Sequence, residues 1–159
     1  TKLSLSCVIS GNSSITYTIT TYQTANGLWL SGSVPNTYTG GTHIIPSGSA
    51  DELHANADGC FGTGDVTVET GGVLELEGSV TDVIDDSADL NLNGTGKVTM
   101  NDRNETINRL RFDGATQPPG TYGGTGSGAD IINTTYFSAD SGVLTVLRGI
   151  VRGTIIRYD

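Results

Sequence analysis

Acidic side chains are the most conspicuous candidates for metal binding in this sequence, and four of them lie in the segment DVIDDSADLN. They are Asp82, Asp85, Asp86 and Asp89. The calcium loop of a helix–loop–helix site needs Gly at its sixth position and Glu at its twelfth. Counted from Asp85, these positions hold Leu90 and Gly96, so that motif is excluded. A looser calcium site and a solvated acidic loop both fit the segment; we favour the loop and expect no bound metal.

Two further acids, Glu75 and Glu77, could serve as the paired carboxylates of a glycan-cleaving enzyme. They alternate with leucines and therefore share the outward face of a strand, about 7 Å apart. Glycosidases hold their two carboxyl groups roughly 5–10 Å apart, but any acidic strand face has the same spacing. A lyase would also need a basic residue, and the basic residues that lie near one another in the sequence are Arg103, Arg109 and Arg111. We expect no glycan cleavage.

The two histidines, His43 and His54, show no hydrolase signature. A serine or cysteine hydrolase needs a histidine beside its nucleophile. The sequence has no G-x-S-x-G, and Cys60 lies in a turn, Asp-Gly-Cys-Phe. Trp29 could stack on a sugar, but its position between two leucines favours a place in the core. The sequence therefore predicts no catalytic residue, no cofactor and a protein that is not an enzyme.

The side chains that could be modified covalently are two cysteines and several asparagines. Cys7 and Cys60 are compatible with one disulfide in an oxidising compartment or with two buried thiols, and we predict the disulfide. Four N-x-S/T sequons are glycosylation candidates. They begin at Asn12, Asn93, Asn104 and Asn133. Asn93 in a Gly-flanked turn and Asn104 in a polar loop are expected to be accessible, whereas Asn12 and Asn133 border strands.

Charge is distributed unevenly along the chain, whose net charge is −9. Residues 1–50 contain no acid, whereas residues 51–146 contain 16 acids and four bases. An acidic body argues against nucleic-acid binding, which requires a basic surface. No apolar run reaches the roughly 20 residues that a membrane span needs. Arg148, Arg152 and Arg157 near the end either attract the acidic body of another subunit or form the polar face of a last strand.

The elements that must position these side chains are short strands. Gly is abundant, with 23 residues, and no window shows convincing helical periodicity. Ser14–Tyr22 alternates Ile15, Tyr17 and Ile19 with threonines, which is typical of a half-buried strand. Further strands are expected at 3–7, 28–30, 65–68, 73–76, 89–92 and 97–100. The chain is therefore predicted to be all-β.

The stretch NTYTGGTHIIPSG, residues 36–48, has the composition of strand segments interrupted by turns, which form the corners of a coil. Its Gly-Gly and Pro-Ser-Gly elements are expected to be corners, with Ile44 and Ile45 filling the core between them. Thr121–Gly126 echoes Thr37–Thr42, and a recurring segment is more often structural than reactive. Short strands at such intervals indicate a coil of stacked rungs.

These segments resemble a known family. NTYTGGTHI followed by GCFGTGDVTVETGGVLELEG is similar to the autotransporter-associated β-strand repeat, which reads Tyr-Thr-Gly-Gly-Thr, a Leu-Gly-x-Gly turn, then Val-x-Val, Gly-Gly and Leu-x-Leu. Phe61 replaces the usual Leu, and Leu53-His54-Ala55 replaces one Leu-x-Leu. NETINRLRFDGATQPPGTYGGTGSGAD and YFSADSGVLTV resemble the segment that closes such repeats. The resemblance covers residues 34–146 and implies a right-handed parallel β-helix or a close β-rich relative, exported and outside the cell.

The resemblance and the charge pattern together predict three segments and a function. Residues 1–33 are expected to be an N-terminal strand segment that pairs with another subunit, residues 34–146 the solenoid body, and residues 147–159 a basic C-terminal strand. We expect an extracellular structural protein, self-assembling as a subunit of a surface fibre and glycosylated. The alternative is a polysaccharide-binding or polysaccharide-degrading module on the same coil.

Overall fold

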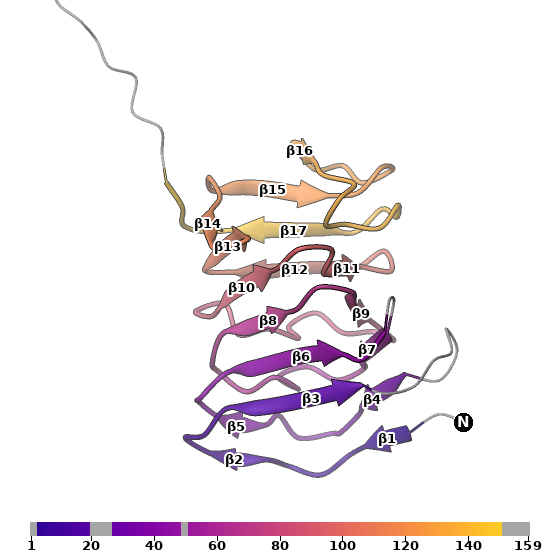
Figure 1. The fold of residues 1–159 in the computed structure, drawn as a ribbon, viewed down its shortest axis with the longest axis vertical. Coiled ribbons are helices and arrows are strands. Elements are labelled where there is room, and N and C mark those ends of the chain that lie inside the picture. The colour runs from indigo at the N-terminus through magenta and orange to yellow at the C-terminus, as the bar shows by residue number, and fades with distance from the viewer. Residues whose placement is uncertain (1–2, 20–26, 49–50, 151–159) are drawn as a thin grey trace, which may run out of the picture.

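The computed structural model describes residues 3–19, 27–48 and 51–150. Within these ranges the chain forms strands and turns and no helix. Successive strands stack in parallel, so the chain winds as a β-solenoid whose rungs follow one another along a single axis (Figure 1). The predicted all-β parallel coil is confirmed.

The first side of the coil is a five-stranded parallel sheet. In spatial order its strands are β1 (Leu3–Leu5), β4 (Leu28–Leu30), β7 (Asp51–Ala55), β9 (Gly72–Leu76) and β11 (Lys97–Thr99). Leu53 on β7 pairs in register with Leu74 on β9, and both are fully buried. Because side chains alternate along a strand, the residues on either side of each leucine in its own strand face outward.

The second side is a six-stranded sheet that carries the opposite wall of the core. Its strands, in spatial order, are β3 (Ile15–Ile19), β6 (Thr42–Pro46), β8 (Val66–Val68), β10 (Asp89–Leu92), β13 (Arg109–Phe112) and β14 (Ala115–Thr116). Ile44 is fully buried and stacks in register with Val68. Ile45 is 39% exposed, so the prediction that both isoleucines fill the core is wrong for Ile45. Alternation along β6 turns it outward.

The third side is short, and side chains replace much of its strand pairing. It contains β2 (Ser10–Gly11) paired with β5 (Thr37–Tyr38). Asn36 accepts a hydrogen bond from the Ile9 N–H at 2.7 Å and donates to the Cys60 carbonyl at 2.7 Å, which ties three rungs together. Further along, the Glu105 carboxylate accepts the Val83 N–H at 2.8 Å. Polar side chains therefore satisfy backbone groups where the sheet is interrupted.

The corners predicted in NTYTGGTHIIPSG occur at Gly41 and at Ser47–Gly48. Gly41 has φ +92°, and a Cβ there would lie 2.9 Å from the Asp65 carbonyl oxygen, so both the backbone conformation and the space demand glycine. The Asp51 carboxylate accepts the N–H groups of Ser47 and Gly48, each at 2.9 Å, which holds the second corner.

The C-terminal end of the coil is covered. A four-stranded sheet contains β12 (Asn104–Ile107), β17 (Val143–Val146), β15 (Gly120–Gly123) and β16 (Ile131–Ile132), with β15 antiparallel to β17. Val98 on β11 exchanges backbone hydrogen bonds with Tyr136 and Ser138, and Phe137 is buried there. Phe112 stacks on Tyr136 with centroids 4.0 Å apart.

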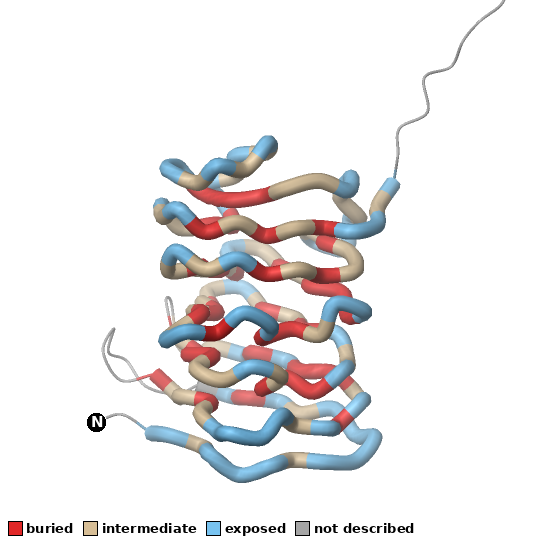
Figure 2. Tube along the Cα trace, turned by 180° about the vertical axis from the view of Figure 1, so that it is seen from behind, coloured by how far each residue is buried: buried red, intermediate tan, exposed pale blue. Residues whose placement is uncertain are grey.

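The N-terminal end has no such cover among the described residues. β1, β2 and β3 each lie at the end of their sheets, and the lowest turn of the coil is largely exposed (Figure 2). β1 and β4 belong to the same sheet as β7, so the coil begins before residue 34. Arg152 and Arg157 of the expected basic strand lie outside the described residues, and β17 ends at Val146.

Candidate functional site

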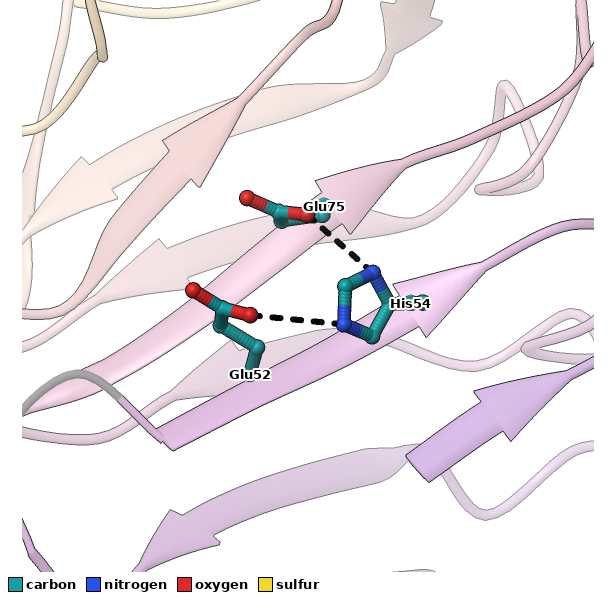
Figure 3. A group of neighbouring side chains, drawn as sticks. All are labelled: Glu52, His54 and Glu75. Carbon is teal, nitrogen blue, oxygen red and sulfur yellow. Dashed lines mark ion pairs between the residues drawn. The ribbon is translucent and has the colours of Figure 1, made fainter. Parts of the chain in front are cut away.

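The outward face of the first sheet brings one histidine together with three glutamates. Glu75 and Glu77 do share an outward face, as the alternation predicts. Their carboxylates meet at His54, whose Nδ1 lies 3.1 Å from Glu75 Oε2 and 3.2 Å from Glu77 Oε1. On the opposite side of the ring, Nε2 lies 3.4 Å from Glu52 Oε2. Figure 3 shows the imidazole held between Glu52 and Glu75. We refer to Glu52, His54, Glu75 and Glu77 as the His54 cluster.

The parallel register of β7 and β9 creates this arrangement. Leu53 pairs with Leu74 inside the core, so the next residues along, His54 and Glu75, pair on the outside. Glu52 lies two residues before His54 on the same strand and therefore on the same face. Glu77 directly follows β9 on the face of Glu75.

The cluster is more buried than an outward strand face usually is. The side chain of His54 is 7% exposed, and those of Glu52, Glu75 and Glu77 are between 15% and 26% exposed. Trp29 on β4 pairs with His54 and stacks on its ring, with centroids 4.2 Å apart and an interplanar angle of 8°. The prediction that Trp29 belongs to the core is therefore wrong: Leu30 beside it is buried, while the half-buried indole covers the imidazole.

Charge and burial act against each other in this cluster. Burial alone would lower the pKa of His54, but hydrogen bonds with Glu75 and Glu77 raise it above its usual value. The same hydrogen bond with His54 lowers the pKa of Glu75. Burial, and next the charge of Glu75, raise the pKa of Glu52. The arrangement can hold a proton on the imidazole or a cation beside it.

The predicted acidic loop is divided in the structure. Asp82 and Asp86 approach Glu105, with one carboxylate oxygen of each within 4.8 Å of the others. Asp85 instead accepts a hydrogen bond from the Ser87 N–H at 2.9 Å, and Asp89 forms an ion pair with Arg111 at 2.7 Å. Burial raises the pKa of Glu105 to about 7. These acids are close together, but nothing else at the loop indicates a bound ion, and we assign no site to it.

The remaining candidates for nucleophilic chemistry are separated. His43 is exposed on β6, on the second sheet, and pairs with Thr16 and Thr67. Cys60 is buried, and burial raises the pKa of its thiol well above the usual range, which disfavours the reactive thiolate. Cys7 is exposed. Both cysteines are free thiols in the structure, yet both line one small cavity, so the Cys7–Cys60 disulfide stays a prediction.

The four sequon asparagines differ in exposure. Asn12 and Asn104 are exposed, and Asn104 begins β12 rather than lying in a loop. Asn93 is half-buried and donates from its side chain to Glu69 at 3.0 Å. Asn133 is half-buried, and its side-chain oxygen accepts the Thr135 N–H at 3.1 Å. Modification of any of them stays a prediction.

Sequence reasoning assessed His54 and the Glu75–Glu77 pair separately and missed that they meet. Glu52 was not singled out at all. The signal that could have found the cluster is the alignment of Leu53-His54-Ala55 with the Leu-x-Leu of the repeat, because it sets His54 opposite Glu75.

Comparisons of the chain with known proteins found no matching protein family, curated protein or solved structure. Among the described residues there is no helix with the length and apolar character to cross a bilayer.

Proposed function

We propose that this protein is an extracellular structural β-solenoid that self-associates through its first rung, as a subunit of a surface fibre. The observation that carries the proposal is the uncovered edge formed by β1, β2 and β3. Edge strands present unpaired N–H and C=O groups that can pair with another chain. At the C-terminal end the last strand of the first sheet, β11, is paired by residues 136–138, which favours association at the N-terminal end.

One ladder of core residues supports this assignment. Leu3, Leu28, Leu53, Leu74 and Val98 lie in register from the first rung to the last. Leu53, Leu74 and Val98 are at most 1% exposed, whereas Leu3 is 66% exposed. Leu3 therefore occupies a core position of the ladder but is exposed to solvent at the N-terminal end, and a second copy of the chain would bury it.

The backbone of β3 offers hydrogen bonds to a second copy. The Ile15 N–H points toward the next rung and donates to the Gly41 carbonyl at 2.9 Å. Because backbone groups alternate along a strand, those of Thr16 and Thr18 point to the unpaired side. Both threonine side chains are exposed. Addition of a strand to an exposed sheet edge is a known mode of association in other proteins.

Charge favours the same contact. Residues 1–50 contain no acid, while residues 51–146 contain 16. Two copies that meet at their first rungs therefore avoid the like-charge repulsion that would oppose contact between their sides. Such a pairing of identical surfaces is a closed two-fold contact, and growth into a fibre would need a second contact elsewhere.

Proline at Thr16 tests the contact, because it removes one outward N–H without removing an internal hydrogen bond. Sedimentation of the 159-residue chain should show concentration-dependent association that Thr16→Pro weakens at least tenfold. Thr16→Ala, which keeps the N–H, is the matched control and should associate like the wild type. A wild-type chain that stays monomeric at all concentrations would overturn the proposal.

The extracellular location and the glycans need a separate measurement. The intact mass of the natural protein should exceed that of the bare chain by the mass of the sugars, with Asn12 and Asn104 as the most exposed acceptors. A mass equal to that of the bare chain would remove the glycan part of the proposal and leave self-association untouched.

The alternative function, polysaccharide binding, is favoured by one observation: the half-buried Trp29 stacks on His54, whose ring nitrogens lie within 3.4 Å of three carboxylates. Aromatic rings that stack on sugars and acids that accept their hydroxyl groups are common in such sites. Saturable binding to a panel of polysaccharides that is lost in Trp29→Ala would establish it. Negligible binding would leave the structural role.

A further inference from the structure

The His54 cluster contains more negative charge than its one imidazole can balance. Even with His54 protonated, three carboxylates face a single positive charge. Among the described residues, neither lysine nor arginine forms an ion pair with Glu52, Glu75 or Glu77. The side chain of His54 is 7% exposed, and those of the three glutamates are between 15% and 26% exposed. Unbalanced charge away from water is costly, and a divalent cation would offset it.

The other ring nitrogen of His54, Nε2, has a nearby proton acceptor, which would leave Nδ1 for a ligand. The side chain of His54 is 7% exposed, yet its Nε2 has no hydrogen-bond partner. A buried polar atom of this kind usually has a partner. Glu52 Oε2 lies 3.4 Å away, close enough to accept a proton from Nε2 after a small shift of the ring.

The two nitrogens of the ring face different surroundings. Glu52 Oε2 lies 3.4 Å from Nε2, and a side chain at position 27 would collide with the ring, since a Cβ added at Gly27 would lie 2.7 Å from Nε2. Nδ1 instead faces two carboxylates, at 3.1 Å for Glu75 and 3.2 Å for Glu77. A tetrahedral zinc ion, with bonds of about 2.0–2.2 Å, keeps its ligand atoms roughly 3.2–3.6 Å apart. The two separations measured from Nδ1 therefore approach those between the ligand atoms of one zinc ion, and Glu52, His54 and Glu75 each offer a ligand atom within 4.8 Å of the other two.

We propose that His54 Nδ1, Glu75 and Glu77 bind a divalent transition-metal ion of the zinc class, with Glu52 holding the imidazole from its other nitrogen. A mixed nitrogen and carboxylate set selects such ions over calcium and magnesium, which prefer oxygen alone. Glu52 accepts the Nε2 proton and so leaves the Nδ1 lone pair for the metal, as carboxylates beside metal-bound histidines do. The ion joins β7 to β9 and acts as a clip between two rungs of the solenoid.

Zinc chloride titrated calorimetrically into the chelator-treated 159-residue chain tests the proposal. We expect one equivalent to bind and the melting temperature to rise. Bound Co²⁺ should give the visible absorption of a tetrahedral site. Ca²⁺ and Mg²⁺ should not compete at equal concentration.

Substitutions then locate the site. Glu77→Gln and His54→Gln should each weaken zinc binding at least tenfold, and Glu52→Gln should weaken it about tenfold through the ring orientation. Matched controls are His43→Gln, the other histidine, and Glu69→Gln, an acid outside the cluster; both should bind zinc like the wild type. Circular dichroism checks that each variant is folded. Should His54→Gln not fold, the result for Glu77→Gln tests the proposal, because Glu77 is the most exposed member of the cluster.

Two results would overturn the proposal. One is a wild-type chain that does not bind zinc, in which case His54 is a protonated histidine held by its glutamates. The other is zinc binding that falls equally in the cluster variants and in the two controls, which would indicate a diffuse attraction to the acidic surface.

Discussion

The two ends of this solenoid use the same ladders of core residues and finish them in opposite ways. At the C-terminal end, Val98 is paired by the backbone of residues 136–138 and is 1% exposed. At the N-terminal end, Leu3 occupies the equivalent rung position and is 66% exposed. A parallel coil has no intrinsic stop, so each end must be covered or left to pair.

The covered end shows what a stop requires. β14 runs antiparallel to β13, and β15 runs antiparallel to β17, so both break the direction of the coil. Aromatic rings then replace the aliphatic ladder, with Phe112 stacked on Tyr136 and edge-on to Tyr122 at 6.3 Å. Among the described residues of the open end every strand pair is parallel, although Tyr17 on β3 is buried there, and this difference in strand direction is why the first rung carries the proposed contact.

The largest expected effect is oxidation of Cys7 and Cys60, which would tie the open rung to the body of the coil. A crosslink across 52 intervening residues contributes about 4 kcal/mol to the free energy of unfolding by loop entropy. Denaturant unfolding of the oxidised and reduced chains measures the difference, and Cys7→Ser should abolish it. Thiols that alkylate in denaturant without prior reduction, after exposure to oxidant, would contradict this prediction.

A second prediction compares an edge strand with an interior strand. Thr16 and Thr67 lie in the same outward ladder, on β3 and β8, with His43 between them. Thr67→Pro should lower the free energy of unfolding by about 3 kcal/mol, because β8 is paired on both sides and one partner is left unsatisfied. Thr16→Pro should cost less than about 1 kcal/mol. Equal losses in chemical denaturation would mean that the first rung is already paired.

The elements on which this comparison rests were largely predictable. The strand at Asp89–Leu92 has its predicted bounds, because apolar and polar residues alternate and Gly and Asn follow. The covered end was not predictable in detail, since antiparallel pairing of β15 with β17 depends on contacts between distant segments. The His54 cluster was not predicted for the same reason. Alternation along the strand decides which face His54 lies on, but only the register between β7 and β9 decides which residue lies beside it. The prediction for Trp29 was wrong because it relied on the hydrophobicity of the side chain and not on its position in the strand, which turns it outward between two inward leucines.

A third prediction concerns a buried acid near the covered end. Burial raises the pKa of Glu105 from its usual 4.5 to about 7, although it accepts backbone N–H groups. The folded state therefore holds the proton more tightly than the unfolded state. This stabilisation is fully present below about pH 4.5 and is lost as pH rises through 7.

The size of that effect follows from the shift. A change of one unit in a pKa corresponds to about 1.4 kcal/mol, and partial solvent access to the carboxyl group reduces the total. Glu105 should therefore lower the free energy of unfolding by about 2 kcal/mol at pH 8 relative to pH 4. Other acids titrate in the same range, so the comparison is with Glu105→Gln, whose profile of unfolding free energy against pH should lack this fall. Parallel profiles for the two proteins would show that Glu105 titrates normally.

The smallest expected effect on stability is at Leu3, and it separates folding from association. Leu3 is mostly exposed, so Leu3→Ser should change the free energy of unfolding of the monomer by less than about 0.5 kcal/mol. Leu53→Ser, at the buried position of the same ladder, should instead cost several kcal/mol, because it removes a filled core site and buries a hydroxyl group. If the first rung meets a second copy, Leu3→Ser should nevertheless weaken association in sedimentation, since the leucine is buried only in the pair. Denaturation at a concentration low enough to keep the chain monomeric, beside sedimentation at a high concentration, measures both quantities on one variant. A large loss of monomer stability would mean that Leu3 is already covered within the chain, and the contrast between the two ends would disappear.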